Sequence, residues 1–432
     1  MHIPDGYLSP IFSLGSGVVT VPVWARTVTK VRAVLNQRTI PLLALFAAMC
    51  FTIMLFTVPV PGGTGAHAVG GTLIAVVLGP EAAVLALSTA LIIQALFFGD
   101  GGILTIFTNC LNLAIILPYA GYFTYRLIAA KSPILSIRRV WAAAIGAYVG
   151  LTAAALAIGI EIGLQPLLFS QNGKPLYSPY PLSISIPAML LSAIFATSIV
   201  EALITAFGLS YFQRSLPEVL TAPTLRSIVS GADAPEGREA QRIPLWRLLA
   251  LIIPLALVVL FLIGLITGGW NVGHLFGADW SQVNWADIGT MLLIVAVIAI
   301  ILIPLTWFAL PRARRKAGVI LMALAILLPL GLISPGFVYE GGPSDIKAAF
   351  GYVPQGFQQL SGFFSAPFSN YNVPLLPFFQ ATSAPLWHIA LGLEISGIIG
   401  ILLIGGVTLG IGWLISRRRS RAVPPVASEK SG

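Results

Sequence analysis

The feature that most constrains this chain is a series of long apolar runs. They fall at residues 7–24, 40–60, 66–80, 81–98, 103–126, 140–164, 182–213, 245–268, 287–309, 317–335 and 387–416. At 1.5 Å per residue, such runs suit a hydrocarbon layer about 30 Å thick. They are continuously apolar and lack the alternation of a membrane strand, which favours helices over a barrel. The sequence therefore predicts an all-α, polytopic membrane protein with about eleven transmembrane helices.

The composition agrees with this fold class. Of the 432 residues, 57% are hydrophobic and only 9% are charged, and the mean hydropathy is +0.92. These values lie far from those of soluble globular domains.

The basic residues predict the orientation of the helices. They cluster within residues 26–38, 126–139, 214–247, 312–316 and 417–430. An N-terminus outside the cell and a cytoplasmic C-terminus put all 22 clustered Lys and Arg residues inside, and leave only Lys174 and Lys347 outside. The net charge of +9 then follows from membrane topology, and we expect no nucleic-acid partner.

The chain divides by composition. Residues 1–213 predict a first unit of about seven helices, and the polar stretch 214–243 reads as a cytoplasmic linker. Residues 244–335 predict additional helices of unknown role. Residues 336–416 predict an aromatic outer loop that folds back on the outer mouth, followed by a final helix, and residues 417–432 form a basic tail.

The first two residues form a candidate metal site. A free amine at Met1, the amide nitrogen of His2 and its Nδ1 can close two fused chelate rings in one plane. The start of the chain lacks the basic region of a cleavable signal peptide, so we expect Met1 to remain. A fourth donor would complete a square, which suits Ni(II) or Cu(II) better than Zn(II) or Mg(II). His67 follows the turn V-P-V-P-G-G-T-G-A, and the predicted topology puts it on the same side as Met1.

A second outer loop, F-F-G-D-G-G at 97–102, has polar residues around it. They are Gln94, Asp100, Thr105, Thr108 and Asn109. Such side chains could hold a liganding imidazole by its second nitrogen. Helix capping and polar contacts between helices explain them equally well.

Other polar residues are expected to serve the fold. Glu201 lies at membrane depth, where a carboxylate is costly, and a hydrogen bond to a neighbouring helix is favoured over a functional role. His274 and His388 are expected at the membrane interface rather than as ligands. Cys50 and Cys110 lie in predicted spans without the pattern of a disulfide framework or metal cluster.

Energy coupling is expected to come from another subunit. The sequence G-x-x-x-x-G-K-S/T does not occur, and the Gly173–Lys174 pair is followed by Pro175 in a predicted outer loop. The acidic residues Glu161, Glu201 and Glu394 are scattered over different spans and do not form a proton relay. We therefore expect a transporter subunit rather than an enzyme.

The motifs resemble those of a known family. M-H-I-P-D-G-Y-L-S-P at 1–10, G-G-T-G-A-H-A-V-G-G-T at 62–72, Q-A-L-F-F-G-D-G-G at 94–102, T-N at 108–109 and I-V-E-A-L-I-T at 199–205 are similar to the CbiM/NikM family over about residues 1–215. These proteins are the substrate-binding S components of energy-coupling-factor transporters for cobalt and nickel. Ala68 and Thr64 depart from the residues frequent in the family, Pro and Ser.

The resemblance implies the site and the partners. The Met1 amine, the His2 amide and imidazole nitrogens and the His67 imidazole would bind the metal, with Gln94 and Asn109 as neighbours. Ni(II) or Co(II) would be transported, with no permanent cofactor. The partners would be a transmembrane coupling subunit and cytoplasmic ABC-type ATPases in a prokaryotic cell membrane, with the metal site facing outside.

The C-terminal part resembles the small NikN-like companion subunit, through P-S-D-I-K at 343–347 and N-Y-N-V-P at 370–374. This implies a fused companion segment with a degenerate first motif. Two other functions remain open at this stage. One is a membrane accessory or scaffold subunit without its own metal site, and the other is an independent secondary metal carrier.

Overall fold

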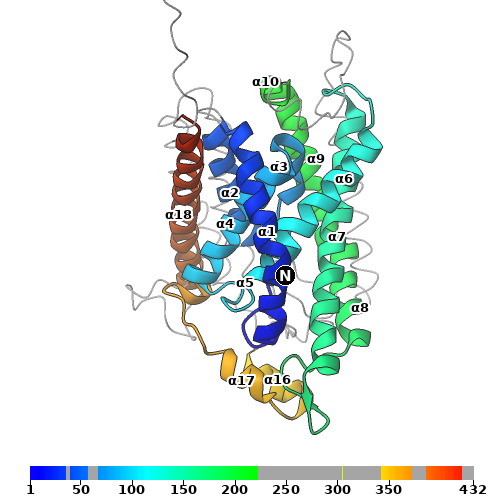
Figure 1. The fold of residues 1–432 in the computed structure, drawn as a ribbon, viewed down its shortest axis with the longest axis vertical. Coiled ribbons are helices and arrows are strands. Elements are labelled where there is room, and N and C mark those ends of the chain that lie inside the picture. Colours follow the sequence, from blue (N-terminus) through cyan, green and yellow to red (C-terminus); the bar gives the residue numbers. More distant parts are fainter. Residues whose placement is uncertain (36–38, 57–66, 222–303, 305–341, 372–385, 421–432) are drawn as a thin grey trace, which may run out of the picture.

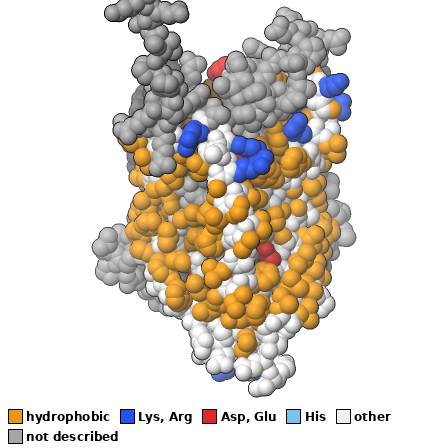
Figure 2. All heavy atoms as spheres, in the orientation of Figure 1, with side chains coloured by type: hydrophobic (Ala, Val, Ile, Leu, Met, Phe, Trp, Pro, Cys, Tyr) orange, Lys and Arg blue, Asp and Glu red, His pale blue; other side chains and the backbone are white. Residues whose placement is uncertain are grey.

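The computed structural model describes residues 1–35, 39–56, 67–221, 304, 342–371 and 386–420. Six helices in this part of the chain are long and apolar enough to cross a membrane. They are Pro10–Arg32, Pro80–Phe98, Ile106–Ala129, Ile137–Leu168, Leu182–Ser215 and Gly392–Ser416. Figure 2 shows a broad hydrophobic face with Lys and Arg side chains gathered along one border. The protein is mostly helical, as the sequence predicts.

The elements follow one another along the chain in Figure 1. The first half comprises α1 (Pro10–Val34), α2 (Thr39–Met54), α3 (Gly71–Leu78), α4 (Pro80–Ile93), the π-helical turn η1 (Gln94–Phe98), α5 (Ile106–Asn109), a second π-helical turn η2 (Cys110–Ile116), α6 (Leu117–Ala129) and α7 (Ile137–Leu168). A short antiparallel hairpin follows, formed by β1 (Ser170–Gln171) and β2 (Lys174–Pro175). The remaining elements are α8 (Leu182–Ser192), the π-helical turn η3 (Ala193–Thr197), α9 (Ser198–Ser215), α10 (Pro217–Thr221), α16 (Pro343–Phe350), α17 (Gln355–Leu360), the short turn η6 (Ser369–Tyr371) and α18 (Leu386–Ser420).

The helix count differs from the sequence pattern at the third apolar run. Of residues 67–79, only Gly71–Leu78 is helical, a length of about 12 Å at 1.5 Å per residue. This helix starts after Gly70, whose φ is +79°, and ends before Gly79 and Pro80. Apart from residue 304, the eighth, ninth and tenth runs lie outside the described residues, and so does His274. The count of eleven and the orientation of the termini therefore stay predictions.

The predicted domain boundaries are covered only in part. The proposed linker begins within α9 and continues into α10. Residues 222–303, 305–341, 372–385 and 421–432 lie outside the described part. The side chain of His388 is also outside it.

Close backbone contact joins α6 to α7. A Cβ at Gly146 would lie 2.5 Å from the carbonyl oxygen of Gly121, and one at Gly150 would lie 2.5 Å from that of Leu117. Membrane helices use small residues in this way because van der Waals packing, rather than the hydrophobic effect, holds them together in lipid.

The N-terminal segment is buried. Met1 and Ile3 expose 2% and 1% of their surface, and α1 begins only at Pro10, where the Ser9 hydroxyl accepts a hydrogen bond from the Phe12 amide at 3.0 Å. Residues 1–9 thus enter the interior before the first helix starts.

The C-terminal elements pack against this first unit. Helix α18 lies along α2 and α4, and the segment with α16 and α17 lies at the end opposite α10 (Figure 1). Phe357 meets Tyr7 edge to face, with ring centroids 5.0 Å apart. The Phe357 amide donates to the Leu176 carbonyl at 3.0 Å.

Glu201 on α9 holds the segment that leads into α3. Its buried Oε2 accepts hydrogen bonds from the amides of Val69 and Gly70, each at 2.7 Å. These amides lie at the start of α3, where an anion also interacts favourably with the helix dipole. Glu201 therefore fixes the backbone two residues beyond His67.

Replacing Glu201 by Ala should lower the free energy of unfolding by about 3 kcal/mol, because two buried N–H groups lose their acceptor. Glu201→Gln keeps one acceptor oxygen and should cost less. Unfolding of the purified protein in mixed micelles measures both changes. Glu218→Ala, at an exposed carboxylate, is the matched control; equal losses at the two positions would contradict the assigned contact.

Candidate metal site

The main chain of Ile3 anchors the start of the protein. Its amide donates to Asn109 Oδ1 at 2.9 Å. Its carbonyl accepts from Asn109 Nδ2 at 3.0 Å, from the Thr105 hydroxyl at 2.6 Å and from the Gly102 amide at 3.0 Å. Together these bonds place His2 in a fixed position beside the loop at 99–105.

Asp5 and Ser9 extend the anchoring along the segment. The Asp5 carboxylate accepts from the amides of Ile103 at 3.1 Å and Leu104 at 2.9 Å. Burial raises the pKa of Asp5, and these amide hydrogen bonds oppose that shift. The Ser9 amide donates to Gln165 Oε1 at 3.0 Å. Residues 3–9 are thus held by two elements that are distant in sequence.

The rings of His2 and His67 lie together inside the protein. Their centroids are 4.7 Å apart, with the planes tilted by 48°. Each residue exposes only 5% of its surface. The Nε2 atoms of both rings are buried and make no hydrogen bond. A buried nitrogen without a partner is costly. The two Nε2 atoms can therefore bind a further group between or beside the rings.

His67 is suited to donate a lone pair. Its Nδ1 lies 3.1 Å from the Ala68 carbonyl oxygen, which assigns the proton to Nδ1 and leaves Nε2 as an acceptor. Burial, then the charge of the N-terminal amine and that of His2, hold the pKa of His67 well below its usual range. The imidazole is therefore neutral at neutral pH, and the chain amine lies close enough to influence it.

Asp100 connects His2 to the C-terminal part of the chain. One carboxylate oxygen lies 2.5 Å from His2 Nδ1. The other accepts from the Tyr371 hydroxyl at 2.6 Å and from Gln94 Nε2 at 3.1 Å. Burial alone would raise the pKa of Asp100, but the charge and hydrogen bond of His2 and the bond from Tyr371 lower it below its usual range. Asp100 is thus a carboxylate that orients the His2 ring.

This contact bears on which His2 nitrogen can bind a metal. As the ring is placed, Nδ1 faces Asp100 and Nε2 is the atom without a partner. The fused chelate predicted from the sequence uses Nδ1. Coordination in that mode therefore requires Nδ1 to exchange Asp100 for the metal.

The polar residues around the second outer loop have separate places. Gln94 and Asp100 lie at the histidines, whereas Asn109 and Thr105 bind the backbone of Ile3. The hydroxyl of Thr108 lies 3.1 Å from that of Ser13 and 3.0 Å from that of Ser16, so it joins α5 to α1. The loop follows η1, and η2 comes after it, beyond α5. π-helical turns of this kind often occur near functional sites.

The nitrogen donors expected from the sequence differ from a cluster of ligating side chains. No group of three or more His, Cys, Asp and Glu within the described ranges could hold a metal ion. A site made from two imidazoles, a chain amine and an amide nitrogen needs no such group. Nitrogen donors of this kind suit Ni(II) and other late transition metals.

Sequence reasoning did not assign Tyr371 or Asp5 to the site. Both lie in motifs that the resemblance uses, N-Y-N-V-P and M-H-I-P-D-G. Their roles depend on contacts with Asp100 and with the amides of Ile103 and Leu104. Since those contacts span up to 271 residues of sequence, no local pattern reports them.

The described fold and the buried histidine pair define a helical membrane protein with an internal polar site, and comparison with known proteins gives its family. Residues 2–219 match the CbiM family, described as the cobalt uptake substrate-specific transmembrane region. The chain belongs to this family, which confirms the resemblance inferred from the motifs. It is a membrane protein of nickel and cobalt transport.

Relatives extend the similarity beyond the family region. The fused nickel transport protein NikMN of Rhodobacter capsulatus is 44% identical over 283 residues, which cover 65% of this chain and 77% of that protein. The probable fused nickel transport protein LarMN of Lactiplantibacillus plantarum is 45% identical over 236 residues, or 52% and 69% of the two chains. A crystal structure of a truncated transition metal transporter is 49% identical, covers 49% of this chain and 98% of that one, and has a TM-score of 0.47. The similarity to fused proteins is consistent with a NikN-like C-terminal segment.

The position of Gly102 allows a test of the anchoring. A Cβ there would lie 2.5 Å from the Asp5 amide nitrogen. Gly102→Ala should therefore push residues 1–6 out of place and weaken binding of Ni(II) by about 10–100-fold, as loss of outer support does at metal sites. Isothermal titration of the purified protein measures this. Gly405→Ala, where a Cβ would meet nothing within 4 Å, should bind as the original chain does, and equal binding by both variants would contradict the packing argument.

Proposed function

We propose that this protein is the substrate-capture component of an energy-coupling-factor importer for Ni(II) or Co(II). The Met1 amine, the His2 amide and imidazole nitrogens and the His67 imidazole bind the metal in a square of nitrogens. The observation that carries the proposal is the buried pair of imidazoles 4.7 Å apart, next to a chain start that is itself buried.

The chemistry of the donors supports a transition metal as the transported substrate. His67 is held neutral, as a metal ligand must be, and its Nδ1 is fixed on a backbone carbonyl. The Met1 amine and the His2 amide must lose protons before they bind, so capture releases protons and weakens in acid. The family description names cobalt and the fused relatives are named for nickel, and the nitrogen square accepts either ion.

The remaining machinery lies in other chains under this proposal. A transmembrane coupling subunit and ABC-type ATPases in the cytoplasm supply the energy, because this sequence has no phosphate-binding G-x-x-x-x-G-K-S/T motif. The protein lies in the inner membrane of a prokaryote, with the metal site facing outside and the basic border of Figure 2 facing the cytoplasm. Movement of the N-terminal segment relative to His67 breaks the square and releases the ion.

The site assignment is tested by removing one donor at a time. His2→Ala, His67→Ala and a two-residue extension before Met1 should each weaken Ni(II) binding more than about 100-fold, because each removes a ligand rather than an outer partner. Equilibrium dialysis of the purified proteins gives the affinities. The same two residues added after Gly432 serve as the control for the extension. Stoichiometric binding by all three variants would exclude this site.

Two alternatives predict different results. An accessory or scaffold subunit without its own site would bind no Ni(II) or Co(II) even as the unaltered chain. An independent secondary carrier would transport the ion into liposomes without any ATPase subunit. Reconstitution of the chain alone, and then with the coupling subunit and ATPases, separates the three functions.

The fused C-terminal segment is proposed to act on the site through Tyr371. Burial and the charge of Asp100 raise the pKa of Tyr371 well above its usual value, so its hydroxyl stays protonated and donates to Asp100. The ring also stacks on Phe98, with centroids 5.0 Å apart. The segment thereby stabilises the carboxylate that orients His2.

Tyr371→Phe removes this hydrogen bond and keeps the stacked ring. It should lower the affinity for Ni(II) by about tenfold, because Asp100 must release His2 Nδ1 to the metal and then depends on Tyr371 and Gln94 for its hydrogen bonds. Tyr352→Phe, in the same segment, removes a hydroxyl from a ring that packs against Lys174 and should leave the affinity unchanged. If both variants bind as tightly as the original protein, the segment does not act through Asp100.

A further inference from the structure

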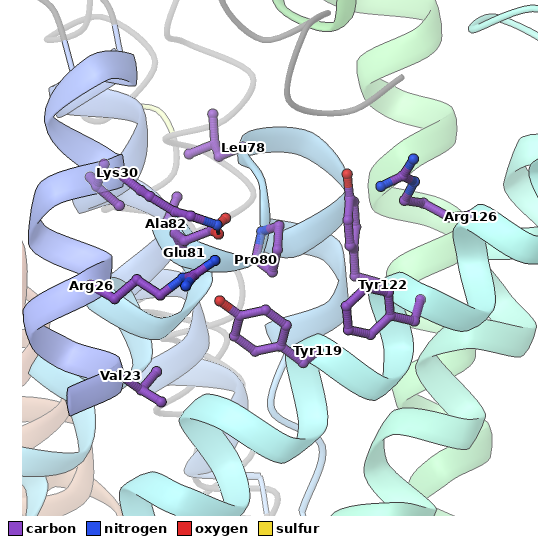
Figure 3. A pocket seen from close by; sticks show the side chains of 12 residues that line it. Val23, Arg26, Lys30, Leu78, Pro80, Glu81, Ala82, Tyr119, Tyr122 and Arg126 are labelled. Atoms are coloured by element: carbon purple, nitrogen blue, oxygen red, sulfur yellow. Dashed lines mark hydrogen bonds and ion pairs between the residues drawn. The ribbon is translucent and has the colours of Figure 1, made fainter. Parts of the chain in front are cut away.

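A second polar site lies far from the histidines. It is a cavity of about 680 Å³ between the second half of α1, the start of α4 and α6. Helix α1 advances by about 24 Å from Pro10 to Arg26, at 1.5 Å per residue. Figure 3 shows Arg26 and Lys30 on one side, Arg126 on the other, and Glu81, Tyr119 and Tyr122 between them. The proposed metal site does not use any of these residues.

The cavity carries an excess of positive charge. Three of its side chains are cationic and one, Glu81, is a carboxylate. Glu81 forms an ion pair with Lys30. Among the residues that the structure describes, no ion-pair partner occurs for Arg26 or Arg126, and the Arg126 guanidinium lies 5.9 Å from the centre of the Tyr122 ring. The guanidinium groups of Arg26 and Arg126 are therefore available to an anion.

Apolar surface continues from the cavity along the same helices. Val23 and Phe123 line it, and Phe123 exposes 60% of its surface. On α1, Val18 and Val19 expose 76% and 50% about one turn nearer the middle of the bundle. In Figure 2 the Lys and Arg side chains border a hydrophobic face of this kind. A ligand that fits both parts has an anionic head and a long apolar body.

We propose that this cavity binds the phosphate headgroup of an anionic phospholipid from the leaflet at the basic end of the bundle. Arginine matches phosphate oxygens with paired N–H donors, and basic pockets between membrane helices recognise such headgroups. The acyl chains lie along the exposed faces of α1 and α6. A free phosphate would make no use of the apolar surface, and an acidic protein segment would leave it facing lipid. The proposal does not depend on metal binding.

The test uses the full-length protein purified in a neutral detergent and titrated with phosphatidylglycerol, with bound lipid counted by native mass spectrometry. Arg26→Gln and Arg126→Gln should each weaken binding about fivefold, the usual contribution of one basic residue near a membrane surface, and the double variant should lose about 25-fold by the same reasoning. Lys131→Gln removes an exposed cation outside the cavity and should bind as the original chain does. Phosphatidylcholine should bind no more tightly to the original chain than to the double variant.

Three outcomes would overturn the proposal. The double variant could bind phosphatidylglycerol as tightly as the original chain. Inorganic phosphate at millimolar concentration could displace the lipid, which would make the cavity a site for a free anion. The two arginines could be protected from a guanidine-modifying reagent only when a purified coupling subunit is added, which would make the occupant a protein. Thermal unfolding checks each variant, and Arg126→Gln alone remains decisive should Arg26→Gln not fold.

Discussion

The hydrogen bonds to the main chain of Ile3 are the interaction on which the rest of the site depends. A polypeptide start is ordinarily mobile, because only one side of it is connected to the fold. Here the Asn109 side-chain amide, the Thr105 hydroxyl and the Gly102 backbone amide hold the N–H and C=O groups of one residue inside the protein. Without them, neither the first amine nor the His2 ring would have a defined position relative to His67. The conformational entropy lost at residues 1–9 is offset by this set of bonds and by the burial of Met1, Ile3 and Tyr7.

Two independent supports meet at the histidines. The first unit supplies the loop at 99–105 and the Glu201 carboxylate, which fixes Val69 and Gly70 behind His67. The second support comes from the C-terminal segment, whose Tyr371 reaches Asp100. Each imidazole is therefore positioned through its surroundings rather than by the other.

The sequence predicts the helical class and the family because both depend on patterns that the chain carries locally. Continuous apolar runs report helices at membrane depth, and the motifs at 1–10 and 62–72 report the family. The short helix Gly71–Leu78 could not be predicted from hydropathy, because residues 68–70 are apolar in composition yet non-helical. The sequence predicts a hydrogen bond for Glu201 but does not identify Val69 and Gly70 as its partners. It also does not distinguish the role of Thr108, which contacts Ser13, from that of Asn109, which binds the Ile3 backbone. Such distinctions depend on which neighbour each side chain contacts. The predicted topology specifies only at which end of the bundle a residue lies.

The contact between Tyr371 and Asp100 joins parts of one polypeptide that are 271 residues apart. Had the companion segment been a separate chain, its occupancy of the site would rise and fall with the number of copies in the membrane. Covalent linkage makes their encounter intramolecular and sets an effective concentration that expression cannot dilute. Every copy of the histidine pair thus has one Tyr371 in the same chain, and the hydrogen bond to Asp100 is independent of protein abundance.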